Sequence, residues 1–157
     1  MKRFLLLFLL LLASPVHSAP LDFEQFFRGR TQGEGALKVL LKPPKRIRVE
    51  SAGVIAKDGT LVLTQRIDEQ GERPRIRQWR LRRTGPTRFE GSLTDAVGPV
   101  VVDLVGDRAR IRYEMKNKLR VEQWLSAGGP KTLHNEMRIR RIGLTVARVK
   151  ETIRKLD

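Results

Sequence analysis

The sequence predicts an all-β protein, an antiparallel up-and-down β-barrel of about nine strands with one short helix before the first strand. Three observations lead to this fold class. Apolar and polar residues alternate with a period of two in many short runs between residues 37 and 140, as they do when one face of a strand is buried. Turn signals separate these runs at spacings of roughly 8–14 residues. A sheet of about nine antiparallel strands curls, and closure into a barrel removes its exposed edges.

The chain has 157 residues, and its first segment differs from the rest. Residues 1–18 read MKRFLLLFLLLLASPVHS. Basic residues come first, then an apolar run, then small residues, which is the order of a secretory signal peptide. The apolar run is shorter than the ~20 residues of a membrane-spanning helix. We therefore expect cleavage after Ser18 or Ala19, a periplasmic location, and a single β-barrel domain over residues 19–157. The alternative is an uncleaved membrane anchor.

A short helix is predicted directly after this segment, in the sequence APLDFEQFFRG. Asp22 can cap the helix N-terminus, with Gln25 as its reciprocal partner three positions on. Phe23, Phe26 and Phe27 then share one face of the helix. A helix of under two turns suits a plug over a protein core better than a membrane-binding segment, so we expect these rings to cover the core.

The predicted strands follow the alternating runs in chain order. They lie at residues 37–41, 46–50, 61–67, 73–83, 100–104, 110–115, 121–125 and 133–140. Turn signals lie between them, among them a hairpin signal at residues 57–59. The last segment, residues 144–157, is ambiguous. Its apolar residues fall at helical spacing, at Val146, Val149, Ile153 and Leu156. Periodicity alone favours a helix there.

One predicted strand, RPRIRQWRLRR at residues 73–83, carries arginines on both faces. If Trp79 and Leu81 face the barrel interior, Arg77 faces it with them, while Arg80 faces water. A buried arginine is costly unless it is paired and hydrogen-bonded. Two interpretations are open. Arg77 forms the polar floor of a ligand cavity beside Trp79, or it is a structural arginine that stacks on Trp79 and is satisfied by backbone carbonyls.

The first interpretation gives a candidate ligand site in the barrel interior. It combines residues predicted to face inward: Arg77, Trp79, Tyr113, Met115, Asn135 and Met137. Asp95 is the best isolated carboxylate, and we expect it to form a structural ion pair with an inward arginine such as Arg77. As a general acid or base, Asp95 lacks an identifiable partner.

The net charge is +15 at pH 7, and such a field attracts polyanions. For a protein exported to the cell envelope, the anions available are lipid headgroups and lipopolysaccharide phosphates. Two interpretations of the outward arginines stay open: a solvated face that keeps the protein soluble, or a surface that contacts an anionic envelope. Nucleic acid is not expected as a partner, because Trp79 lies on the face opposite the outward arginines.

The sequence carries no signature of an enzyme. It has no cysteine, which excludes disulfides and thiolate chemistry. His134 is the one histidine after residue 18, and a lone histidine cannot build a His-based metal site. A nucleophile elbow and a phosphate-binding loop that opens a helix are both missing. We therefore expect a protein that is not an enzyme and has no metal and no cofactor.

Several motifs stand in an order that resembles a known family. They are Leu21-Asp22, Phe26-Phe27-x-Gly29, Arg77-x-Trp79-x-Leu81, Gly91-x-x-x-Asp95-x-Val97-Gly98, Gly106, Arg112-Tyr113, Trp124, Asn135-x-Met137 and Gly143. Together they resemble the bacterial domain-of-unknown-function family DUF 3833 over nearly the whole chain after residue 18. The resemblance implies a proteobacterial envelope protein with a lipocalin-like (calycin-type) barrel, in which the tail from Gly143 is a closing strand. Many relatives look like lipoproteins, whereas this chain has no cysteine to carry a lipid. The family has no assigned activity and supplies no catalytic residues.

Two functional hypotheses follow. The first is a non-enzymatic, monomeric periplasmic barrel that binds a small lipophilic or anionic ligand in its interior. The second is a basic envelope protein that docks on lipopolysaccharide or anionic lipid through its arginine-rich outer face.

Overall fold

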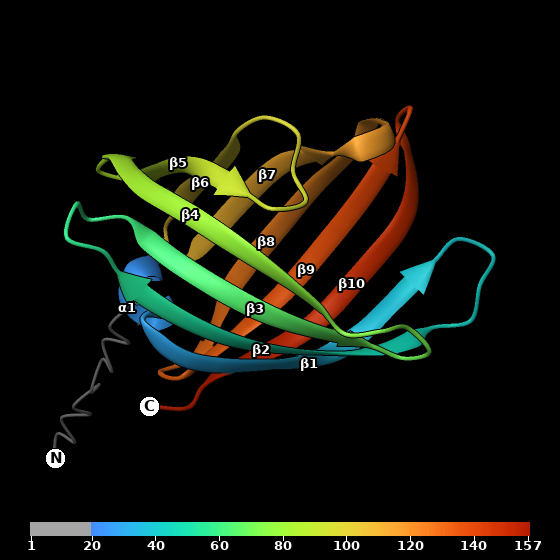
Figure 1. Cartoon of the computed structure of the whole chain (residues 1–157), viewed down its shortest axis with the longest axis horizontal. Coiled ribbons are helices and arrows are strands. Elements are labelled where there is room, and N and C mark those ends of the chain that lie inside the picture. The colour runs from blue at the N-terminus through green and yellow to red at the C-terminus, as the bar shows by residue number, and fades with distance from the viewer. Residues whose placement is uncertain (1–19) are drawn as a thin grey trace, which may run out of the picture.

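A computed structural model describes residues 20–157 (Figure 1). The expected signal peptide and its cleavage site lie outside the described residues. One α-helix, α1 (Phe23–Phe27), precedes ten strands in this part of the chain, and a 3-10 helix, η1 (Lys116–Lys118), lies between the seventh and the eighth strand. The strands are β1 (Gly29–Val39), β2 (Lys45–Ile55), β3 (Leu61–Glu69), β4 (Arg75–Gly85), β5 (Arg88–Leu93), β6 (Val100–Val105), β7 (Arg108–Met115), β8 (Leu119–Gly129), β9 (Thr132–Arg141) and β10 (Leu144–Lys155). Within residues 20–157, no helix has the length and apolar character needed to cross a membrane.

The strands form one closed antiparallel barrel (Figure 1). Each strand pairs with its neighbours in sequence, and β1 also pairs with β10 to close the wall. The predicted all-β, up-and-down barrel with a short N-terminal helix is therefore confirmed. The strand number is ten rather than about nine, because β5 was not among the predicted runs. Its six residues include Gly91 between Phe89 and Leu93, so its alternating pattern is short and weak.

The C-terminal segment is the closing strand β10, as the family resemblance implied, and the helix favoured by periodicity is wrong. A β-bulge between Thr145 and Ala147 shifts the register against β9. Beyond the bulge, Val149, Glu151 and Ile153 occupy the inner face of the strand. The bulge and the inward carboxylate of Glu151 interrupt the alternation of apolar and polar residues, so the sequence does not show the period of two that is typical of a strand. Without β10, the edges of β1 and β9 would be left unpaired, which a sheet of this size avoids.

Helix α1 covers one end of the barrel (Figure 1). Its N-terminus is capped as predicted, because the Asp22 carboxylate accepts from the Gln25 backbone N–H at 3.1 Å. All three phenylalanines of the helix are buried. The Phe23 ring lies 5.5 Å from the ring of Phe89, between centroids. The helix is thus the predicted plug, and its apolar burial fixes it to the core.

The opposite end of the barrel, which we name the open end, is not covered by α1, and the 3-10 helix η1 lies in one of its connections (Figure 1). It is formed by the connections β1–β2, β3–β4, β5–β6, β7–β8 and β9–β10.

Candidate ligand cavity

The barrel interior has a packed half and a hollow half. Toward α1, side chains fill the space and leave a gap of only about 40 Å³ beside Trp79. Toward the open end lies a cavity of about 490 Å³, within the size range of small-molecule sites. Most of its wall is apolar, formed by Leu37, Ile47, Val49, Ile67, Met115, Leu119, Met137, Ile139 and Val149. These residues sit at the inward positions of seven strands, so period-two patterning builds the apolar wall.

A buried amide organises the floor between the two halves. Gln65 on β3 lies directly opposite Arg77 on β4. Its Oε1 accepts from Arg77 Nε at 2.9 Å and from Trp79 Nε1 at 2.6 Å. Its Nε2 donates to the hydroxyl of Ser51 on β2 at 3.1 Å. The guanidinium of Arg77 also lies 5.2 Å from the centroid of the Trp79 ring. Arg77 is therefore fixed by a side-chain amide and an aromatic face.

Tyr113 on β7 brings a hydroxyl to the same floor. Burial raises the pKa of this phenol above its usual value. Arg77 opposes that shift through its charge and a side-chain hydrogen bond, whereas the charge of Asp95 adds to it. The ring meets Trp79 edge-on, with centroids 5.6 Å apart and planes at 89°. Burial favours the neutral phenol, whose O–H can donate a hydrogen bond.

Glu151 on β10 is an inward carboxylate at the boundary between the two halves. Burial raises its pKa, while the hydrogen bond from Asn135 and the charge of Arg77 partly oppose the rise. The Nδ2 of Asn135 donates to Glu151 Oε2 at 2.8 Å. Gly33 on β1 makes room for this side chain, since a Cβ there would lie 1.8 Å from Glu151 Oε1. Burial thus favours the neutral carboxyl, which can donate a hydrogen bond.

The six predicted site residues all point into the barrel but divide between its halves. Arg77 lies at the boundary and lines both spaces. Tyr113, Met115 and Met137 line the hollow half. The other two, Trp79 and Asn135, lie in the packed half beneath the floor.

The expected ion pair between Asp95 and Arg77 is not formed. Asp95 follows β5 and lines the cavity from the loop that leads to β6. Among residues 20–157, no carboxylate lies within ion-pair distance of Arg77, which is held by Gln65 instead. Within residues 20–157, the Arg77 side chain also forms no hydrogen bond to a backbone carbonyl, so the second interpretation is correct only in the stacking on Trp79.

Two important side chains were not in the predicted site, Gln65 and Glu151. Gln65 could have been found, because it interrupts an otherwise apolar inward series in residues 61–67. Glu151 likewise interrupts an inward series, Ala147, Val149 and Ile153, but the helical spacing of this segment obscured that signal. Neither joins a metal site, since residues 20–157 hold no group of three side chains suited to a metal ion.

Among solved structures with this fold, the S-type phycobiliprotein lyase CPES from Guillardia theta has a TM-score of 0.68 at 7% identity and covers 87% of this chain and 92% of its own. Rv2717c from M. tuberculosis has a TM-score of 0.65 at 14% identity, with coverages of 84% and 94%. A protein of unknown function from the DUF3598 family of Nostoc punctiforme has a TM-score of 0.67 at 15% identity, with coverages of 92% and 53%. At such identities the likeness shows the fold alone. No curated protein matches the chain.

A family model agrees with the sequence motifs and with the barrel. The family described as protein of unknown function (DUF3833) matches residues 15–155. This range spans the helix, all ten described strands and the cavity floor. The chain therefore belongs to the DUF3833 family.

Proposed function

We propose that this protein is a non-enzymatic, monomeric periplasmic barrel that binds a small lipophilic ligand with an acidic head group. One observation carries the proposal: a cavity of about 490 Å³ has an apolar wall and ends on Arg77. No described carboxylate forms an ion pair with Arg77. A cation at the floor of an apolar cavity favours an anionic acceptor in the ligand.

Three donors converge where the head group would lie. Arg77 offers guanidinium N–H groups, Tyr113 offers its hydroxyl, and Glu151 offers a carboxyl proton in the neutral form that burial favours. A carboxylate or phosphate oxygen can accept from all three. The apolar wall above them suits a hydrocarbon body. The phycobiliprotein lyase shares the fold at 7% identity, so that likeness supports the barrel as a scaffold and names no ligand.

Calorimetric titration with dodecanoate and with dodecanol tests the proposal, because the two probes share a body and differ in the head. We expect dodecanoate to bind more tightly. Arg77→Gln should weaken dodecanoate binding about tenfold or more, as the loss of a charge-assisted hydrogen bond of roughly 1.5–3 kcal/mol requires. Dodecanol binding should change little.

Arg80→Gln is the matched control. Arg80 lies on the same strand, faces outward and is exposed, so it removes the same charge without touching the cavity. Equal losses for Arg77→Gln and Arg80→Gln would show that only the general positive field attracts the probe. Failure of dodecanoate to bind, or chemical conversion of a probe, would contradict a non-enzymatic binding role.

The periplasmic location rests on the leader-like sequence of residues 1–18. Expression of the full chain in a Gram-negative host, followed by osmotic-shock fractionation and intact mass measurement, tests it. We expect the protein in the periplasmic fraction with the mass of a chain that begins at Ala19 or Pro20. An uncleaved mass in the membrane fraction would support the anchor instead.

A further inference from the structure

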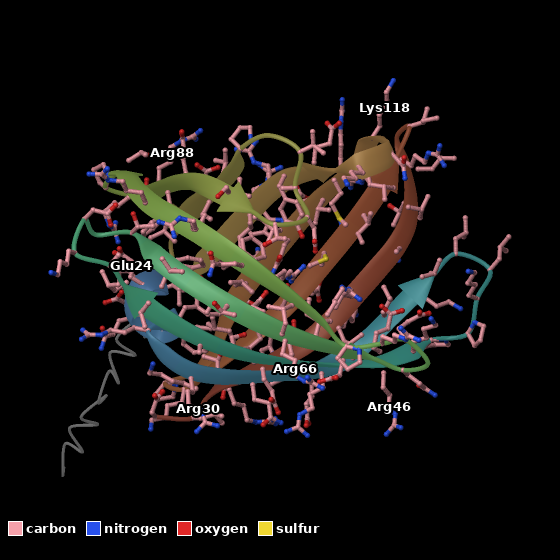
Figure 2. The ribbon with its side chains drawn as sticks, in the orientation of Figure 1. Glu24, Arg30, Arg46, Arg66, Arg88 and Lys118 are labelled. Atoms are coloured by element: carbon pink, nitrogen blue, oxygen red, sulfur yellow. The ribbon has the colours of Figure 1, made fainter. Side chains whose placement is uncertain are left out.

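The outer wall of the barrel is basic, and in several sectors ion pairs offset part of the charge. On β2 and β3, Arg48 binds Glu50 at 3.0 Å and Arg66 binds Asp68 at 3.1 Å. On β6, Asp103 bridges Arg88 of β5 and Arg112 of β7. Figure 2 labels Arg88 at the outer surface of the barrel. At the open end, the β2–β4 side is also paired, because Glu69 binds a lysine and an arginine there. In these sectors, carboxylates interleave with the arginines and lysines and bind several of them.

The sector formed by β8, β9, β10 and β1 near the open end is different. Lys38, Arg148 and Arg138 lie directly opposite one another across β1, β10 and β9. In the next row, Arg120 on β8 lies opposite Arg140 on β9. All five side chains are exposed, and we name them the cationic wall. Like charges placed opposite each other destabilise a sheet.

The acids beside the cationic wall do not neutralise it. Glu122 lies opposite Arg138 but binds Arg110, with its Oε2 3.0 Å from Arg110 Nε. Glu114 lies opposite Arg120. No member of the wall forms an ion pair within 4 Å among residues 20–157. A row of mutually repelling, unpaired cations is a surface suited to an anionic partner.

Two apolar turns flank the same sector. Leu41 in the β1–β2 turn is 95% exposed and Ile142 in the β9–β10 turn is 88% exposed. Their neighbours Leu40 and Leu144 are exposed at 58% and 71%. The backbone N–H of Leu40 donates to the Val146 carbonyl at 2.9 Å, so the end of β1 lies against the start of β10. We name Leu40, Leu41, Ile142 and Leu144 the apolar rim.

The backbone at both tips is unusual for apolar residues. Leu41 has φ of 62° and Ile142 has φ of 49°, in the left-handed region that glycine and asparagine prefer. This conformation is especially unfavourable for a β-branched residue such as Ile142. Exposed, strained and apolar tips beside unpaired cations are not explained by the stability of the isolated barrel, and exposed apolar clusters mark interaction sites.

We propose that the open end docks on an anionic phospholipid bilayer, with the apolar rim inserted among the headgroups and the cationic wall against the lipid phosphates. Apolar tips with adjacent basic residues match the two layers of a membrane interface. The bound orientation turns the cavity mouth toward the bilayer and α1 away from it (Figure 1). The docking surface itself does not depend on the cavity having a ligand. The proposal narrows the docking surface from the whole arginine-rich outer face to the cationic wall and the apolar rim.

Vesicle co-sedimentation of the full chain, expressed with its leader and purified after export, tests the proposal. The vesicles contain phosphatidylcholine alone or phosphatidylcholine mixed with phosphatidylglycerol. We expect binding to the mixed vesicles only, and a steep decline as salt is raised. The wall variant Arg138→Gln/Arg148→Gln should lower the partition coefficient roughly 25-fold, from about fivefold for each basic residue.

The rim variant Leu41→Asn/Ile142→Asn removes the apolar tips and keeps the fold, because asparagine accepts the left-handed conformation. We expect it to lose most of the vesicle binding while its thermal midpoint stays unchanged or rises. The matched control is Arg80→Gln/Arg82→Gln, two exposed arginines of β4, which removes the same charge elsewhere. This control should retain vesicle binding within about twofold of the unchanged protein, because Arg80 and Arg82 lie outside the docking sector and far from the bilayer.

Several outcomes would overturn docking by this sector. They are equal binding to neutral vesicles, equal losses in the wall variant and its control, and undiminished binding of a folded rim variant. Binding to lipopolysaccharide micelles but not to phosphatidylglycerol would name a different partner and overturn the proposal as well. Arg77→Gln separates the two proposals, since it alters only the cavity floor: vesicle binding that survives this change supports docking even where dodecanoate binding is lost.

Discussion

Arg77 and Gln65 face each other across β4 and β3, and Arg77 Nε donates to Gln65 Oε1 at 2.9 Å. The same oxygen accepts from Trp79 Nε1 at 2.6 Å. One amide therefore positions both the cation and the indole at the cavity floor. This arrangement explains how an inward arginine is tolerated without a carboxylate partner, because its charge is hydrogen-bonded and stacked.

Gln65→Leu should destabilise the barrel. The substitution leaves the Trp79 N–H and the Arg77 Nε–H without their shared acceptor in a buried site. We expect the free energy of unfolding to fall by about 2–3 kcal/mol, from unsatisfied buried donors. Urea denaturation followed by circular dichroism measures this.

Gln78→Leu is the control for that change. Gln78 is on the adjacent strand and exposed, so its replacement should cost within about 0.5 kcal/mol. Similar costs for the two variants would mean that the Gln65 amide does not organise the floor.

Glu151→Gln should change how stability depends on pH. Burial raises the pKa of Glu151 in the folded protein, so the folded state holds this proton more tightly than the unfolded chain. Stability is then fully present below the unfolded pKa and falls as pH rises through the folded pKa. Glutamine stays neutral and can keep the contact with Asn135. Thermal melts from acidic to neutral pH should show the variant gaining stability over the unchanged protein as pH rises.

The carboxylate Glu136 supplies the control for that experiment. It lies on the outer face of β9 and is exposed, so Glu136→Gln should not reproduce the gain. A constant difference between Glu151→Gln and the unchanged protein at every pH would show that folding does not raise the pKa of Glu151, and would contradict its burial in the neutral form.

Gly53→Ala should loosen the plug. A Cβ at Gly53 would lie 1.8 Å from the carbonyl oxygen of Phe27, and backbone at the end of α1 cannot move aside without losing ring packing. We expect a loss of about 1–3 kcal/mol, as for other overpacked sites, together with faster hydrogen exchange in α1. Gly85→Ala is the matched control, because the nearest atom to a new Cβ there is 3.7 Å away. A loss equal to that of the control would contradict the close approach.

The alternation of the sequence was sufficient to predict the barrel wall, because a strand places successive side chains on opposite faces. It correctly placed Trp79 and Tyr113 inside and Trp124 outside, where the guanidinium groups of Arg108 and Arg110 lie 4.3 Å and 5.5 Å from the centroid of the Trp124 ring. The helix plug was also predictable, from the Asp22 cap and three phenylalanines on one face.

The rest depended on distances that a pattern does not contain. The strand β5 is short and holds a glycine, and the bulge in β10 reverses the alternation. The volume of the cavity depends on how closely strands approach, as at Gly35, where a Cβ would lie 2.0 Å from the Lys150 carbonyl oxygen. Asp95 was expected to pair with Arg77, but its position in a loop is set by tertiary packing rather than by strand register.

Methyl NMR on the two methionines after residue 1, Met115 and Met137, tests ligand binding in the cavity most directly. Both side chains lie in the cavity wall, so methionine labelled with ¹³C at the methyl carbon gives two probes at the proposed site. Titration with dodecanoate should shift both methyl resonances with one shared saturation curve, and Arg77→Gln should move that curve to higher ligand concentration. Binding measured by calorimetry with both methyl resonances unmoved would place the ligand elsewhere and contradict the account.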